Sequence, residues 1–80
     1  MIYLTEEEQK KGIMEHNFFM MWKLDEDSEC LCGGFRKHLF LALGHATPDN
    51  IRKLATVYPI EVFAFLEYED RLEEFSIFEV

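Results

Sequence analysis

The chain has 80 residues, enough for one domain with one hydrophobic core. Hydrophobic residues make up 49% of it and aromatic residues 15%, a composition that excludes an intrinsically disordered segment. Asp and Glu number 16 against 8 Lys and Arg, giving a formal net charge of −8. That charge disfavours direct nucleic-acid binding and favours a partner with a basic surface.

The expected compartment is the cytoplasm, with no membrane association. The N-terminus runs directly into three glutamates and lacks the basic and apolar regions of a signal peptide. The richest apolar runs, Phe18 to Trp22 and Leu39 to Leu43, are too short to span a bilayer. Cys30 and Cys32 are separated by one residue, a spacing too tight for an ordinary structural disulfide, so we expect reduced thiols.

A first helix is expected to begin after Thr5, because Thr5 and Glu8 have the spacing of a capping box. Gly12 weakens the middle of this helix. The nearly continuous apolar band that follows leaves the alternative that Asn17 to Leu24 is a buried strand. As a helix, the segment places these apolar residues close to one stripe, which Phe19 and Met20 widen: Ile13, Met14, Phe18, Met21 and Trp22.

Residues 25–34 are predicted to form a loop, since a charged run is followed by the strong turn signal Gly33-Gly34. A short amphipathic helix is expected after this loop. Its apolar positions follow the spacing i, i+4, i+7 and i+8: Phe35, Leu39, Ala42 and Leu43.

Two prolines predict two further helices, over about 48–58 and 59–73. Thr47 can cap the first, and Pro48 and Pro59 suit the first helical position. Tyr58 is expected inside the corner between them. The tail Phe75 to Val80 is expected to add a short strand beside Ile2-Tyr3-Leu4. The predicted fold is mainly α, a single-domain bundle of three to four short helices over residues 1–80 with a short terminal β-pairing.

Metal binding and catalysis are both disfavoured by the residue spacings. Cys30 and Cys32 have one residue between them rather than the two to four of zinc sites, and His38 and His45 are seven apart rather than three to five. A Cys–His nucleophile using the amides of Gly33-Gly34 is a further option, but so short a chain seldom encloses a substrate. We therefore expect a protein that is not an enzyme and has no cofactor.

The candidate partner-binding surface combines aromatic anchors with a run of carboxylates. The aromatic band is either core or an interface, and the acidic run is either a solvated face or a surface complementary to a basic groove. The candidate residues are Phe18, Phe19, Trp22, Glu67, Glu69, Asp70, Glu73 and Glu74.

A sequence pattern between Phe35 and Tyr68 is carried by Ala46, Asp49, Asn50, Lys53, Leu54, Tyr58, Pro59 and Val62. It resembles short uncharacterised proteins encoded by bacteriophages and prophages, over less than half of the chain, with Thr47-Pro48 as a departure. The resemblance implies a phage accessory protein in the host cytoplasm. Such proteins frequently bind and inhibit host machinery, so we expect an anti-CRISPR-like or other anti-defence inhibitor of a host protein. The alternatives are a self-assembling homodimer and a small metal-binding domain.

Overall fold

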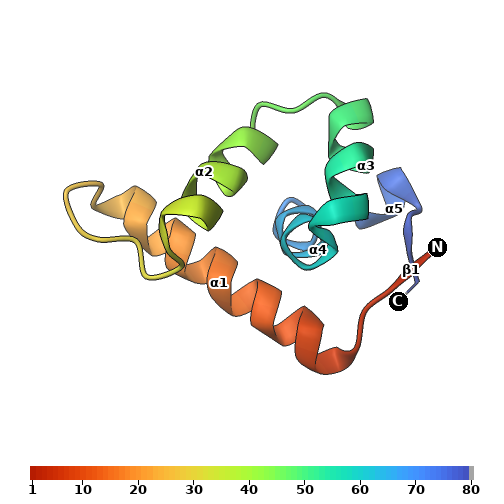
Figure 1. The fold of residues 1–80 in the computed structure, drawn as a ribbon, viewed down its shortest axis with the longest axis horizontal. Coiled ribbons are helices and arrows are strands. Elements are labelled where there is room, and N and C mark those ends of the chain that lie inside the picture. The colour runs from red at the N-terminus through yellow and green to blue at the C-terminus, as the bar shows by residue number, and fades with distance from the viewer. Residues whose placement is uncertain (80) are drawn as a thin grey trace.

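The computed structural model describes residues 1–79, which form five helices and one pair of short parallel strands (Figure 1). The mainly α fold and the pairing of the chain ends are confirmed, with one additional helical turn. Val80, the end of the predicted tail strand, lies outside the described residues. In chain order the elements are β1 (Ile2–Tyr3), α1 (Glu6–Leu24), α2 (Gly34–Leu43), α3 (Pro48–Val57), α4 (Pro59–Tyr68), α5 (Leu72–Phe75) and β2 (Phe78–Glu79).

Helix α1 begins at the predicted capping box. The Glu8 amide donates to Thr5 Oγ1 at 3.1 Å, and the Thr5 amide donates to Glu8 Oε1 at 2.9 Å. The helix runs without a break to Leu24, so the strand alternative for residues 17–24 is wrong. Local capping and an acidic first turn stabilise the start of this helix. Among residues 1–79, no helix is both long enough and apolar enough to cross a bilayer.

Both prolines begin helices, as predicted, but α4 ends at Tyr68 rather than near residue 73. Asp70 takes up a left-handed backbone conformation with φ 55°. The Arg71 amide donates back to the Leu66 carbonyl at 2.9 Å, and the Asp70 amide to Glu67 at 3.2 Å. This is the Schellman arrangement that closes a helix C-terminus, and it separates α4 from the short α5.

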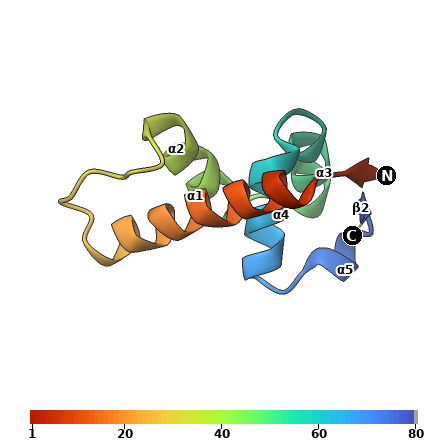
Figure 2. The ribbon, with the colours of Figure 1, turned by 90° about the horizontal axis from the view of Figure 1, so that it is seen from below.

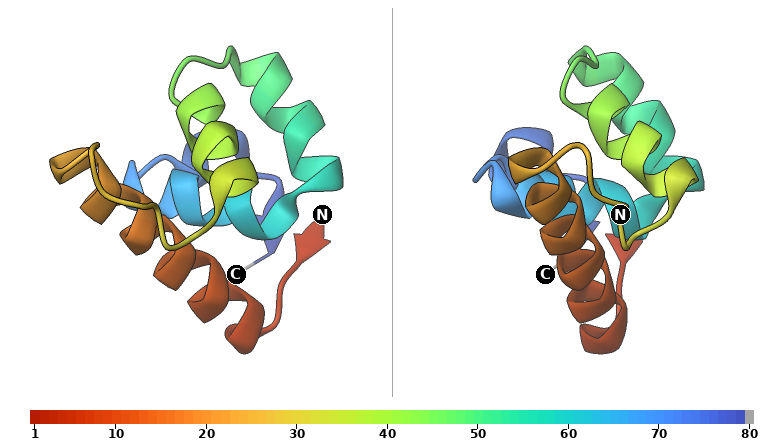
Figure 3. Two further views of the ribbon diagram at one scale, coloured as in Figure 1. Left: turned by 60° about the vertical axis from the view of Figure 1, so that its left-hand side comes forward. Right: turned by 90° about the vertical axis from the view of Figure 1, so that its left-hand side faces the viewer.

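Helix α4 lies in the middle of the molecule, with α1 on one side and α2 and α3 on the other (Figures 1 and 3). All residues from Glu61 to Leu66 are buried. Helix α1 approaches α4 closely at Gly12, where an added Cβ would lie 2.7 Å from the Ile60 carbonyl oxygen. Gly12 is therefore a packing position as well as a weak helix former.

Only part of the apolar stripe predicted for α1 faces the core: Trp22 is buried and Phe18 is half-buried. Ile13, Met14 and Met21 are exposed, while the buried positions are Gly12, Glu15, His16, Phe19 and Trp22. The close contact at Gly12 fixes the rotation of α1 about its axis, and Phe19 and Trp22 continue the same side at i+7 and i+10. In α2, Leu39 and Leu43 are buried as predicted, together with Phe40, but Phe35 and Ala42 are exposed.

The chain ends pair through β1 and β2, with Ile2 opposite Phe78 and Tyr3 opposite Glu79. The Ile2 amide also donates to the Ile77 carbonyl at 2.8 Å. The loop of residues 25–33 lies at the opposite end of the molecule (Figures 1 and 2). Tyr58, predicted inside the α3–α4 corner, is half-buried against the core, and its ring contacts Phe35 with centroids 5.3 Å apart.

Candidate functional site

Helix α1 buries two adjacent polar residues, which the sequence analysis did not single out. Glu15 is 7% exposed and His16 is 3% exposed. Charged side chains are almost never fully buried unless they are paired, and buried polar groups need partners. The surroundings of each of these two residues therefore show how its buried polar group is accommodated.

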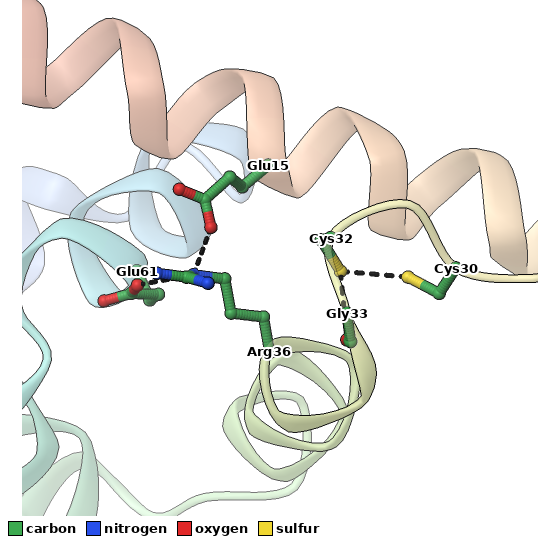
Figure 4. Close-up of polar contacts among 6 residues, drawn as sticks. All are labelled: Glu15, Cys30, Cys32, Gly33, Arg36 and Glu61. Carbon is green, nitrogen blue, oxygen red and sulfur yellow. Dashed lines mark hydrogen bonds and ion pairs between the residues drawn. The ribbon is translucent and has the colours of Figure 1, made fainter.

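Glu15 belongs to an ionic cluster that joins three helices (Figure 4). Arg36 of α2 donates its Nε–H to Glu61 Oε2 of α4 at 3.0 Å, and the same nitrogen forms an ion pair with Glu15 of α1. Desolvation lowers the pKa of Arg36, but hydrogen bonds and charges from Glu61 and Glu15 outweigh it and raise the pKa overall. The guanidinium therefore stays charged between two carboxylates.

The ionic cluster links helices α1, α2 and α4 through the Arg36 side chain. One guanidinium faces two nearly buried carboxylates, and Glu15 Oε1 has no hydrogen-bond partner among residues 1–79. In such a cluster, removal of one partner leaves a buried charge uncompensated, which destabilises the fold. This is the behaviour of a structural ion pair. Glu15, Arg36 and Glu61 do not line the cavity beside His16.

His16 lies at the base of an aromatic cavity between α1, α2 and α4. Its ring centroid is 4.9 Å from Phe40, 4.9 Å from Tyr68 and 5.8 Å from Phe19. Burial lowers the pKa of His16 below its ordinary value. The cavity has a volume of about 300 Å³ and is open on one side. Cavities of this kind, apolar with few polar groups, are the usual form of small-molecule sites.

The cysteines lie in the loop before α2, with Sγ atoms 2.9 Å apart (Figure 4). Cys32 is buried, and burial, followed by the hydrogen bond and charge of Cys30, raises the pKa of its thiol to about 12. A protonated thiol is a poor nucleophile and a poor metal ligand. Within residues 1–79, no group of three or more His, Cys, Asp or Glu side chains is arranged to hold a metal ion.

The predicted partner-binding residues fall into two separate environments. Phe19 and Trp22 lie in the core, where Lys37 Nζ covers the Trp22 ring at 4.9 Å, and Phe18 is half-buried against that core. The carboxylates are exposed at the end of α4 and on α5: Glu67, Glu69, Asp70, Glu73 and Glu74. The acidic part of the predicted surface is therefore accessible on the monomer, and the largest aromatic anchors are not.

A different set of apolar side chains faces outward from α1. We define the outer face of α1 as Ile13, Met14, Asn17, Met21 and Leu24. The apolar members, in that order, are 38%, 51%, 59% and 89% exposed. Seen from below, α1 lies in front of α4 with its near side uncovered by other elements (Figure 2).

The acidic end of α4 borders this outer face. Glu67 and Tyr68 line one hollow together with Ile13 and Asn17. Tyr68 is itself exposed, so apolar, aromatic and acidic side chains meet along this edge. Ile13, Met14 and Met21 belong to the apolar stripe seen in the sequence, so that stripe is the sequence signal for the outer face.

Comparison with protein-family models, with curated proteins and with solved structures finds no match to this chain.

Proposed function

We propose that this protein is a binding module that docks on another protein through the outer face of α1. The observation that carries the proposal is the solvent exposure of Met14, Met21 and Leu24 on a helix whose opposite side forms the core. Contiguous exposed apolar side chains on a small protein are typical of interaction sites. Methionine adapts its shape to different partner surfaces, which suits such a role.

The spacing on α1 fits the docking of a helix in a groove. Ile13, Asn17, Met21 and Leu24 follow at i, i+4, i+8 and i+11, the spacing by which a helix presents one side to a groove. From first to last these positions span roughly 16 Å along the axis, since each residue rises about 1.5 Å. An interface of standard size needs more contact area than these side chains offer, so the neighbouring Tyr68 edge would belong to it.

The exposed carboxylates favour a partner with a basic surface. Glu67 lines the hollow at the edge of the outer face; Glu69 and Asp70 are exposed just after it in the chain, and Glu73 and Glu74 are exposed on α5. Charges at the rim of an interface act chiefly by steering association, and salt weakens that effect. We propose that the partner is a host protein and that the protein is a phage or prophage accessory inhibitor, a proposal that rests on the resemblance between Phe35 and Tyr68.

Affinity capture with matched variants tests the docking surface. The protein and the double variant Met14→Gln/Met21→Gln would be immobilised and exposed to bacterial lysate, and bound proteins quantified by mass spectrometry. The control is Leu31→Gln/Val57→Gln, which changes two apolar residues that are exposed outside α1. We expect the α1 variant alone to lose its partner. Equal capture by both variants would contradict the proposal.

Self-association is the second candidate, and the charges flanking the outer face favour it. Lys10 and Lys11 lie before the apolar positions, and residues 25–27 are all acidic. Antiparallel packing of two copies of α1 would bring the lysines of each copy near the acidic run of the other. Sedimentation of the purified chain distinguishes this candidate, because Met14→Gln/Met21→Gln should then convert a dimer to a monomer.

A further inference from the structure

The cavity beside His16 is large enough for a small ring compound. Its volume is about 300 Å³. An engineered apolar cavity of about 150 Å³ in another protein takes up benzene. One or two fused rings would therefore fit. The cavity opens to solvent on one side, so a ligand could enter without unfolding of the surrounding helices.

Four aromatic residues contribute to the walls of the cavity, beside the aliphatic side chains of Met20 and Leu41. Side chains of Phe19, Phe40, Phe65 and Tyr68 surround the His16 imidazole, whose ring meets Phe40 edge-to-face at an interplanar angle of 88°. Aromatic rings attract one another in edge-to-face and offset arrangements beyond the effect of buried area. This lining favours a flat aromatic ligand over an aliphatic one of equal size.

His16 supplies a polar group to the cavity, and its ring nitrogens are not among the fully buried unpaired side-chain atoms of residues 1–79, which both belong to Glu15. The His16 residue is only 3% exposed. No side-chain hydrogen bond of its imidazole occurs among residues 1–79. Since His16 lines the cavity, a bound molecule can provide the missing hydrogen bond. Burial lowers the pKa of His16, so the imidazole is neutral near pH 7 and offers one acceptor nitrogen.

The charged groups at the rim do not select an ion of one sign. Lys23 and Glu69 both line the cavity, and their charges oppose each other; His45 is a further ionisable residue of the lining. A ligand without net charge avoids the cost of leaving water in this apolar cavity.

We propose that this cavity binds a small uncharged aromatic molecule with one hydrogen-bond donor, of the phenol or indole class, whose donor meets the imidazole of His16. This site shares Tyr68 with the edge of the proposed interface, but it goes beyond the protein-binding function because it requires neither the outer face of α1 nor a protein partner.

Titration of the whole chain with phenol, followed by NMR of isotope-labelled protein, tests the proposal. Benzene is the matched probe, since it has the ring without the donor. We expect saturable shifts of the His16 and Tyr68 ring signals and about tenfold tighter binding of phenol than of benzene, the ratio that one hydrogen bond supplies. No saturable shift with phenol, or equal affinity for the two probes, would overturn the proposal.

Two variants place the binding in the cavity. Tyr68 is 56% exposed, so Tyr68→Ala should fold, and we expect it to weaken phenol binding by about tenfold through loss of one aromatic wall. Val57→Ala changes an exposed side chain on α3 that does not line this cavity, and should bind as the wild type does. If Tyr68→Ala also bound phenol with wild-type affinity, the cavity would not be the site.

Discussion

Replacement of Gly12 by alanine should destabilise the protein, although alanine is the better helix former. Alanine in place of glycine stabilises a helix interior by about 1 kcal/mol. Here the new Cβ would lie 2.7 Å from the Ile60 carbonyl oxygen, 2.9 Å from Ile60 Cγ2 and 3.3 Å from Ala64 Cβ. The nearest of these atoms belongs to the backbone of α4, which cannot move aside as a flexible side chain can. Overpacking of this kind costs up to about 3 kcal/mol, which leaves a net loss of about 2 kcal/mol.

Urea denaturation, monitored by circular dichroism, measures this loss in the free energy of unfolding. In thermal unfolding of a domain of this size, about 2 kcal/mol corresponds to a fall in Tm of roughly 8 to 16 °C. The matched control is Gly34→Ala at the start of α2, where an added Cβ meets no atom within 4 Å. We expect the control to unfold at or slightly above the wild-type midpoint. If Gly12→Ala were as stable as wild type, the close packing of α1 on α4 would be incorrect.

Three other predictions test the interior and a helix end. Arg36→Ala should lower the free energy of unfolding by about 3 kcal/mol, measured by urea titration. This is the lower end of the range for a broken buried ion pair, because Arg36 is partly exposed. Glu61→Gln leaves a single carboxylate for Arg36 and should lower the free energy of unfolding clearly less. Asp70→Gly should stabilise by about 0.5 to 1 kcal/mol, since glycine adopts φ 55° without strain; a lower Tm would show that the Asp70 side chain supports the turn. Burial lowers the pKa of His16 in the folded protein, so stability held above pH 6.5 should decline as the pH falls below 6.5 and the unfolded chain takes up the proton. His16→Phe should flatten this decline, whereas a matching change at exposed His38 should not.

The helix boundaries that depend on local chemistry were predictable from the sequence. Thr5 with Glu8, Thr47 with Pro48, and Pro59 each satisfy or remove amides at a helix start, and the structure has helices beginning at all three places. The end of α4 was not predictable in this way. It depends on a left-handed Asp70, a conformation more common for glycine, so the sequence carried no strong stop signal there.

The orientation of α1 could not be read from its own residues. An apolar band with an ambiguous period leaves the inner side open, and the close approach of Gly12 to α4 decides it. Once α1 is oriented, Glu15 and His16 turn inward and Met14 and Met21 turn outward. The cluster of Glu15, Arg36 and Glu61 was missed for the same reason, because it joins three helices that only the tertiary fold brings together.

The accessible carboxylates were predictable, since a run of charges such as Glu67 to Glu74 is rarely buried. The exposed apolar anchors could not be predicted from the sequence. Phe19 and Trp22 pack in the core, which was one of the two alternatives for the aromatic band, and the apolar side chains that α1 exposes are aliphatic or methionine. The proposed docking surface therefore keeps the acidic part of the sequence-based prediction and replaces its aromatic part.

Site-specific photo-crosslinking tests most directly whether the outer face of α1 is a docking surface. A photoreactive phenylalanine would be placed at Met21 in one variant and, as control, at Val57, which is exposed to a similar extent on α3. After irradiation in bacterial lysate, we expect a discrete adduct from position 21 and none of the same mass from position 57. An adduct of twice the 9.6 kDa chain mass would identify a second copy as the occupant. No adduct from position 21, or the same adduct from both positions, would contradict docking through α1.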